Sequence, residues 1–250
     1  MPGARNVLII LASFLMGLGF SRCDASREDG ILALGAAQET LQYSPCAEYS
    51  KPPNLAFLLP EYSARFQLDQ TQYETILVGD SSMDLSSRYP GFLSATTQSV
   101  AVFGNTMCDM IMQLPAINTV APLAIVVSST GANDLKYVPR IATTQIVNTG
   151  ALLVQNLRSR FPNAMLVMVA IHPRENEYVN VNKASVNSGV QSALRNSPGK
   201  GCFYDPLPLF GVAEGQPARS EDLLDDQTHY NQNMSFKIKA AVQEICKITI

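Results

Sequence analysis

Short apolar runs alternate with longer amphipathic stretches from residue 75 to the end of the chain. Runs of strand length are found at residues 75–78, 99–103, 123–128, 165–171 and 202–204. Helix-like stretches occupy residues 105–114, 141–160, 181–195 and 231–246. Because continuously apolar strands alternate with helices, the pattern predicts an α/β fold with a parallel sheet of about five strands, covered by helices on both faces.

The last helix-like stretch, residues 231–246, carries its apolar residues on one helical face. That face consists of Met234, Ile238, Ala241, Val242 and Ile245. We expect this face to pack against the rest of the domain.

The first 25 residues have the pattern of an export signal. Arg5 precedes an uncharged apolar run at residues 7–20, and small polar residues follow it. A helix needs about 20 apolar residues to cross a bilayer, so this run is short for a membrane span. The signal of residues 1–25 ends either before Cys23, as in a lipoprotein attached to the membrane through that cysteine, or at Ala25. The alternative is a buried N-terminal helix.

Prolines interrupt the chain between this signal and the first predicted strand. We therefore predict an irregular leader over residues 26–70, which covers one side of the domain, and a single α/β domain over residues 71–250. The mature length of about 225 residues fits one α/β domain. The predicted location is outside the cytoplasm: periplasmic, outer-membrane lipoprotein or extracellular.

Composition and charge restrict the partners of this protein. Of its 250 residues, 46% are hydrophobic and 16% are charged, and the net charge is −3. A nucleic-acid partner would need a patch that neutralises phosphates, and the sequence contains no run of lysine and arginine. We therefore expect a globular protein that binds no nucleic acid.

Four cysteines remain once Cys23 is set apart as part of the signal. Four cysteines in an exported chain can form two disulfides, with three connectivities. Cys202 and Cys246 are both in the C-terminal quarter, so we predict that they pair with each other. The alternative is four buried free thiols, which would also include Cys46 and Cys108.

Polar residues and glycines follow four of the predicted strands. They form the segments Gly79-Asp80-Ser81, Gly104-Asn105, Gly131-Ala132-Asn133-Asp134 and His172-Pro173. In a parallel sheet of this kind, ligands bind outside the carboxyl ends of the strands. We therefore expect these segments to meet at one site.

Ser81 is the candidate nucleophile of that site. A serine attacks an ester when a histidine takes its proton and an acid orients the histidine. We predict that His229 is the base, because Asp226 comes three residues before it on a loop ahead of the last helix. The other histidine, His172, has no carboxylate before it, and we expect it to be a rim or loop residue.

Three donors follow successive strands and are predicted to hold the oxyanion of the reaction. They are the Ser81 N–H, the Gly104 N–H and the side-chain amide of Asn133, each worth on the order of 3–4 kcal/mol in the barrier. Phe103 and Met107 are close to these residues in sequence. We expect both to be core residues rather than the lining of an acyl pocket.

Taken together, these segments resemble the motifs of the SGNH hydrolase superfamily, the GDSL-type esterases and lipases. The matching residues are Gly79-Asp80-Ser81-Ser82, Gly104 within residues 102–106, Gly131-Ala132-Asn133-Asp134 and Asp226-Gln227-Thr228-His229. The resemblance covers about residues 75–246, and the leader lies outside it. It implies a flavodoxin-like fold with three layers, α/β/α.

The resemblance also implies an exported serine esterase that hydrolyses carboxylic esters through an acyl-enzyme, without metal or cofactor. Ser81 would be its nucleophile, His229 its base and Asp226 the partner of the base, while Asp80 would support the turn. Ser81, Gly104 and Asn133 would form the oxyanion hole. The substrate would be a small ester, a lipid or an acylated sugar.

Other functions stay open at this point. An O-acyltransferase or acetylesterase that acts on envelope or plant polysaccharide would use the same triad, and a protein of this fold with little activity is a further alternative. The segment from Asp80 to Asp84 is also similar to the motif Asp-x-Ser-x-Ser, with which von Willebrand A-type adhesion modules hold a divalent cation. That interpretation leaves Asn133, Asp226 and His229 unexplained.

Overall fold

The computed structural model describes residues 46, 49, 52–66, 73–117, 121–137 and 141–250. A five-stranded sheet with the order β2-β1-β3-β4-β5 lies at its centre, and all neighbouring strands are parallel. The strands are β1 (Thr75–Val78), β2 (Thr97–Ser99), β3 (Ala124–Val127), β4 (Met165–Val169) and β5 (Gly201–Tyr204). This is the flavodoxin-like strand order, in which ligands bind at the carboxyl ends of the strands near β1 and β3.

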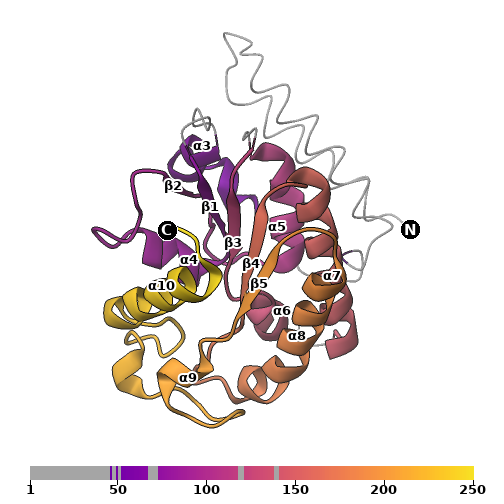
Figure 1. Ribbon diagram of the computed structural model, residues 1–250. Helices are drawn as coiled ribbons and strands as arrows, with labels where there is room; N and C mark the ends of the chain where they lie inside the picture. Colours follow the sequence, from indigo (N-terminus) through magenta and orange to yellow (C-terminus); the bar gives the residue numbers. More distant parts are fainter. Residues whose placement is uncertain (1–45, 47–48, 50–51, 67–72, 118–120, 138–140) are drawn as a thin grey trace, which may run out of the picture. The chain divides into compact units, whose positions relative to one another are not determined.

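Helices cover both faces of the sheet, so the predicted three layers are confirmed (Figure 1). On one face lie α4 (Ser81–Ser87) and α10 (Gln232–Cys246). On the other lie α5 (Met107–Gln113), α6 (Ala132–Tyr137), α7 (Thr143–Arg160) and α8 (Glu177–Asn196). The shorter elements are η2 (Leu55–Leu58), α3 (Pro60–Phe66), η4 (Leu114–Ala116), α9 (Leu207–Phe210) and η5 (Ser220–Asp222).

The central strands are apolar because both of their faces are covered. Every residue of β1 and β3 is buried. The predicted apolar face of α10 packs in the core through Met234, Ile238 and Val242. Ile245 is the exception, with 57% of its surface exposed. Its neighbour Cys246 is bonded to β5, and successive side chains on a helix point about 100° apart, so Ile245 turns away from the core.

The second strand ends earlier than its apolar run predicts. The prediction was residues 99–103, whereas β2 is Thr97–Ser99. Beyond it, the N–H groups of Val100 and Val102 still donate to the carbonyls of Leu77 and Gly79, at 2.8 and 3.2 Å. The apolar run therefore marks a segment that is buried as far as Val102, whereas the regular strand ends at Ser99.

Much of the N-terminal region lies outside the described residues, including the predicted export signal and Cys23. Within the predicted leader, the described residues 52–66 form η2 and α3, although their prolines suggested an irregular path. Pro60 is the first residue of α3, where a missing N–H costs no helical hydrogen bond. None of the helices in the described ranges is long and apolar enough to span a membrane. The division at residues 25 and 70 stays a prediction.

Two disulfides connect parts of the chain that are far apart in sequence. The predicted pair of Cys202 and Cys246 is confirmed, and this bond joins β5 to the end of α10. Cys46 pairs with Cys108, which joins the region before η2 to α5. The alternative of four free thiols is therefore wrong.

Candidate active site

Ser81 is the first residue of α4, and only Gly79 and Asp80 separate it from the end of β1. The side chain of Asp80 caps this helix by accepting the N–H of Ser82 at 2.9 Å, as a residue that supports the turn would do. A side chain at Gly79 would place its Cβ 2.9 Å from Ser128 Oγ and 3.0 Å from Met83 Cβ. Gly79 is therefore needed for the close packing of this turn.

Ser81, His229 and Asp226 form one chain of hydrogen bonds. The distance between Ser81 Oγ and His229 Nε2 is 2.6 Å, and that between His229 Nδ1 and Asp226 Oδ2 is 2.5 Å. Ser81 and His229 are 148 positions apart in sequence, and both are buried. Since a carboxylate only accepts, Nδ1 carries the proton, and Nε2 can then accept the hydroxyl proton of Ser81.

A closed turn between η5 and α10 holds the acid and the histidine together. The N–H groups of Thr228 and His229 donate to Asp226 Oδ1 at 2.9 and 3.0 Å. An antiparallel bridge between Leu223 and Tyr230 closes the base of the turn. Partial burial alone would raise the pKa of Asp226, but the hydrogen bonds from His229 and Thr228 lower it to about 2. Asp226 is therefore a carboxylate at neutral pH.

The second histidine, His172, lies in the loop after β4, as predicted, but it is buried beneath this turn and is not at the rim. Its Nε2 donates to the carbonyl of Thr228 at 3.0 Å, and its Nδ1 accepts from Ser129 Oγ at 3.2 Å. Burial, together with the nearby charge of Arg174, lowers its pKa well below the usual value for histidine. His172 is thus a neutral residue that supports the turn next to His229, which explains why it is not within bonding distance of Ser81.

The predicted oxyanion donors lie on three segments that follow β1, β2 and β3 and are bonded to one another. Asn105 Nδ2 donates to the carbonyl of Gly79 at 3.3 Å, next to the turn that carries Ser81. Asn133 Nδ2 donates to the carbonyl of Asn105 at 2.8 Å, which uses one of the two N–H groups of this amide. Gly104 has a φ of 79°, a left-handed conformation that favours glycine. The loops after β1, β2 and β3 are therefore brought together at the carboxyl edge of the sheet.

Two buried residues of this framework were not singled out as site residues from the sequence. The side chain of Asn105 exchanges two hydrogen bonds with Gln113, at 2.7 and 3.0 Å, besides its bond to Gly79. Asp134 accepts the N–H of Met107 at 3.1 Å at the start of α5. Neither role has a local sequence signal, because each bond joins residues that are distant along the chain.

Phe103 and Met107 have different environments. Met107 is fully buried, as predicted for a core residue. Phe103 is 52% exposed, so its assignment to the core was wrong, and its ring centre lies 5.9 Å from that of His229. Phe103 directly follows Val102, whose N–H donates to the carbonyl of Gly79 just beyond β1, and the side chain of Phe103 lies at the surface beside the histidine.

The residues of the alternative cation motif are used by other partners. The two oxygens of Asp84 each bind an arginine at 2.7 Å, namely Arg65 and Arg88. Asp80 faces the helix start, and burial raises its pKa to about 6 in spite of the charge of Arg174. In the described part of the chain, no cluster of three or more histidine, cysteine, aspartate or glutamate residues could hold a metal ion. These contacts give no support to a cation site at this motif.

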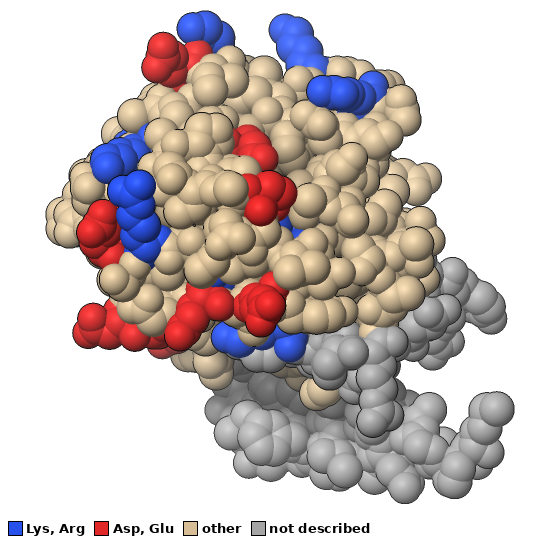
Figure 2. All heavy atoms as spheres, turned by 90° about the horizontal axis from the view of Figure 1, so that it is seen from below, with Lys and Arg blue, Asp and Glu red and all other residues tan. Residues whose placement is uncertain are grey.

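Charges of both signs are distributed over the end of the molecule at which α9 lies (Figure 2). Acidic and basic side chains lie beside one another at several places there, with uncharged surface between these groups. A partner rich in phosphate would need a continuous positive patch. The described part of this view shows no such patch.

Comparison with solved structures finds the same fold in several ester hydrolases. A GDSL-like lipase from Bacteroides thetaiotaomicron aligns with a TM-score of 0.58 and 14% identity, over 75% of this chain and 94% of the lipase. A carbohydrate esterase of family 3 from Talaromyces cellulolyticus aligns with a TM-score of 0.52 and 14% identity, over 71% of this chain and all (100%) of the esterase. The OSK domain of Drosophila Oskar aligns with a TM-score of 0.57 and 13% identity, over 74% of this chain and 96% of that domain.

Comparison of the sequence with protein-family models gives no match, and comparison with curated proteins also gives none. These similarities show the fold alone: it is the fold that a GDSL-like lipase and a carbohydrate esterase also have. The identities of 13–14% are too low to transfer an activity, and the Oskar domain shows that proteins with other names share this fold.

Proposed function

We propose that this protein is a serine hydrolase of carboxylic esters, with Ser81 as nucleophile, His229 as base and Asp226 as the residue that orients the base. The observation that carries the proposal is the chain of two hydrogen bonds from Ser81 Oγ through the imidazole to the carboxylate, at 2.6 and 2.5 Å. The three residues come from two elements that are distant in sequence, and this arrangement is the one that nucleophilic catalysis by serine requires.

In the first half of the reaction, Ser81 Oγ attacks the carbonyl carbon of the ester while its proton moves to His229 Nε2. The negative oxygen of the tetrahedral intermediate would be held by the N–H groups of Ser81 and Gly104 and by the amide of Asn133. Asp226 stabilises the imidazolium without taking its proton. The intermediate collapses, the bond to the alcohol breaks, and the alcohol leaves with the proton from Nε2.

In the second half, water attacks the acyl-enzyme. His229 Nε2 takes a proton from the water, and the same donors hold the second tetrahedral intermediate. When this intermediate collapses, the proton on Nε2 returns to Ser81 Oγ and the carboxylic acid is released. These steps use side chains and backbone groups of the protein alone.

The alcohol part of the substrate has to lie beside His229, because the alcohol receives its proton from Nε2. The exposed ring of Phe103 is next to this position, with 5.9 Å between the ring centres. An alcohol with an apolar or ring-shaped body would bury this side chain, and acylated sugars and aryl esters are therefore suitable substrates.

Export of the protein is part of this proposal. Disulfides form and persist in oxidising compartments, and Cys46–Cys108 and Cys202–Cys246 are both bonded. The predicted signal of residues 1–25 would direct this export, with or without a lipid on Cys23. Transfer of the acyl group to a polysaccharide hydroxyl, rather than to water, remains the alternative for the second half of the reaction.

Hydrolysis of p-nitrophenyl acetate in the presence of a chelator tests the proposal. We expect Ser81→Ala to lose essentially all turnover and to become inert towards an organophosphonate that labels the wild-type serine. Ser82→Ala is the matched control, since the hydroxyl of Ser82 is buried and has no hydrogen-bond partner among the described residues. Near-normal activity of Ser81→Ala would refute the proposed nucleophile.

Analysis of the products formed from an acetylated sugar separates hydrolysis from acyl transfer. We expect free acid as the main product when an acetylated sugar is supplied together with a second, unacylated sugar. Accumulation of the second sugar in its acylated form would instead identify a transferase that uses the same triad.

A further inference from the structure

Asn54, which precedes η2, lies in the region outside the resemblance to known hydrolases, yet it contacts the loop that carries Gly104. Its side-chain Nδ2 donates to the carbonyl of Phe103 at 2.8 Å and to Asn105 Oδ1 at 2.9 Å. These two residues flank Gly104. The Oδ1 of the same amide accepts the N–H of Ala56 at 3.1 Å and thereby caps η2. All polar atoms of this side chain are thus engaged.

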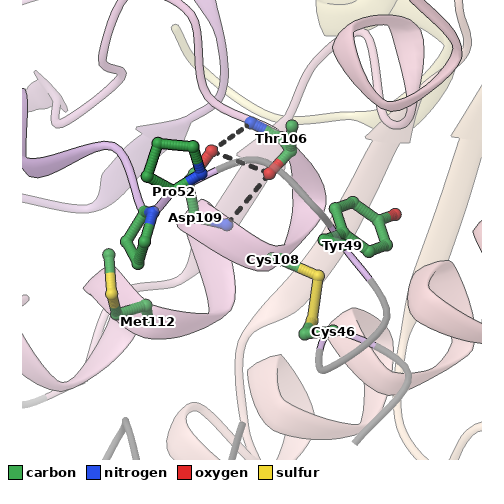
Figure 3. A pocket seen from close by; sticks show the side chains of 8 residues that line it. Cys46, Tyr49, Pro52, Thr106, Cys108, Asp109 and Met112 are labelled. Carbon is green, nitrogen blue, oxygen red and sulfur yellow. Dashed lines mark hydrogen bonds between the residues drawn. A yellow bond between two sulfur atoms is a disulfide. The ribbon is translucent and has the colours of Figure 1, made fainter. Parts of the chain in front are cut away.

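The segment that carries Asn54 is attached to α5 by several bonds. The backbone N–H of Asn54 donates to Asp109 Oδ1 at 2.7 Å. The other oxygen of Asp109 accepts the N–H and the hydroxyl of Thr106, which begins α5 (Figure 3). The disulfide Cys46–Cys108 joins the same two parts of the chain. The backbone of Asn54 is therefore held in place against α5, so its side chain can restrain the loop around Gly104.

A pocket lies between the segment that precedes Asn54 and helix α5, and residues of both line it (Figure 3). Its lining residues are Cys46, Tyr49, Pro52 and Pro53 from the N-terminal segment and Thr106, Cys108, Asp109 and Met112 from the start and body of α5. The hydroxyl of Tyr49 donates to Asp134 Oδ1 at 2.5 Å, which adds an attachment to α6.

The bond from Asn54 to Phe103 has a direct effect on the candidate oxyanion donor. The carbonyl of Phe103 and the N–H of Gly104 belong to the same peptide unit, which is planar and trans, so the two groups point in opposite directions. A donor fixed on the carbonyl oxygen therefore sets the direction of the Gly104 N–H and also polarises it. Glycine has the greatest backbone freedom of any residue, so this loop gains most from an external restraint.

We propose that Asn54 is a positioning residue for the oxyanion hole: by binding both neighbours of Gly104, it aims the Gly104 N–H at the developing negative charge. This inference rests on the proposed ester hydrolysis, and it assigns a role in the site to a segment that precedes the first strand. Preorganised donors are effective because they need no rearrangement during the reaction, and Asn54 supplies that preorganisation to Gly104.

Two substitutions separate this role from the capping of η2. Asn54→Ser keeps an oxygen that can cap the N–H of Ala56 but removes both donated bonds. Asn54→Asp keeps the size of the side chain and the cap, but its carboxylate would face the oxygens of Phe103 and Asn105. If Asn54 were only a cap, aspartate would be as good as asparagine. If Asn54 is a positioning residue, Asn54→Asp should lose more activity than Asn54→Ser.

We expect kcat for p-nitrophenyl acetate to fall about tenfold in Asn54→Ser and further in Asn54→Asp, with KM changed less than about twofold. The rate of labelling of Ser81 by an organophosphonate should fall in parallel, because its phosphoryl oxygen occupies the oxyanion hole. The melting temperature of Asn54→Ser should stay close to that of the wild type, since the cap is retained. Asn176→Ser is the matched control: Asn176 caps α8 through the N–H of Val179 at 3.0 Å, away from this loop.

Two results would overturn the positioning role. One is that both Asn54 variants keep the kcat and the labelling rate of the wild type, and the other is that KM rises while kcat is unchanged. If the wild type and Ser81→Ala hydrolyse esters equally, the proposed function itself fails. If the wild type is active, Ser81→Ala is inactive and the Asn54 variants match the wild type, only the role of Asn54 is refuted.

Discussion

Asp226→Asn tests the orientation of the histidine with almost no change of shape. In the wild type, the N–H groups of Thr228 and His229 donate to Asp226 Oδ1 at 2.9 and 3.0 Å. The Oδ1 of asparagine can still accept both, so the turn should keep its form. The carboxylate oxygen Oδ2, which accepts from His229 Nδ1 in the wild type, is replaced by an amide group whose N–H donates to His229 Nδ1. The imidazole proton then has to be on Nε2, where it faces Ser81 Oγ and blocks removal of the serine proton.

The expected loss follows from this reversal of the tautomer. We expect kcat to fall by about 10⁴, which corresponds to about 5.4 kcal/mol in the barrier at about 1.36 kcal/mol for each factor of ten. The free energy of unfolding should change little, because the side chain of Asp226 is 48% exposed and its backbone contacts are kept. Asp226→Ala should lose similar activity and, in addition, some stability, because the two backbone N–H groups lose their acceptor.

The assay is hydrolysis of p-nitrophenyl acetate, with urea unfolding of each variant as the measure of stability. Asp225→Asn is the control, because it removes the same charge from the neighbouring, exposed residue. The reasoning is refuted if Asp226→Asn retains activity within about tenfold of the wild type, or if Asp225→Asn loses as much. Either result would mean that Asp226 does not determine the tautomer of His229.

Four further predictions follow from the structure. Asn133→Ala should lower kcat by about 10²–10³ with a smaller change in KM, and an effect on KM alone would remove Asn133 from the oxyanion hole. Burial raises the pKa of Asp134 to about 6, so its buried carboxyl favours folding less as the pH rises from about 4 to 6. The free energy of unfolding of Asp134→Asn, taken relative to that of the wild type, should therefore be higher at pH 7.5 than at pH 4, by up to about 3 kcal/mol in urea unfolding. A difference between the two proteins that does not change with pH would contradict this. Joint replacement of Cys202 and Cys246 by serine should lower the free energy of unfolding by about 4 kcal/mol for a sequence separation of 44, whereas an unchanged midpoint in urea would show that the bond is not formed. Phe103→Ala should raise KM for aryl esters more than for ethyl esters, and equal changes would place the alcohol elsewhere.

The order of strands and helices could be predicted from the sequence because burial on both faces leaves a local pattern. Continuous apolar runs identified β1, β3, β4 and β5 close to their observed positions, and the amphipathic stretches identified α7 and α8. The polar segments after these strands then had to lie on one edge, since all parallel strands point their carboxyl ends the same way. The candidate nucleophile and the pair Asp226 and His229 could be named on this basis.

The helix α4 was not predicted, because it is short and mostly polar and has no amphipathic pattern, although Asp80 supplies a local cap at its start. The place of His172 also required the fold. His172 directly follows the apolar run of residues 165–171, but only its contact with the carbonyl of Thr228, 56 positions away, makes it a neutral support of that turn. The same holds for Phe103, whose apolar side chain is exposed beside His229.

From the sequence alone it was possible to predict the class of fold, the candidate catalytic residues and the edge of the sheet at which they gather. Tertiary structure alone decided which atoms meet: Nε2 of His229 with Ser81 over 148 positions, and Asn54 with the loop around Gly104 over about 50. The physical reason is that hydrophobic periodicity is a local property of the chain, whereas a hydrogen bond between distant residues depends on the packing of every element between them and leaves no local pattern.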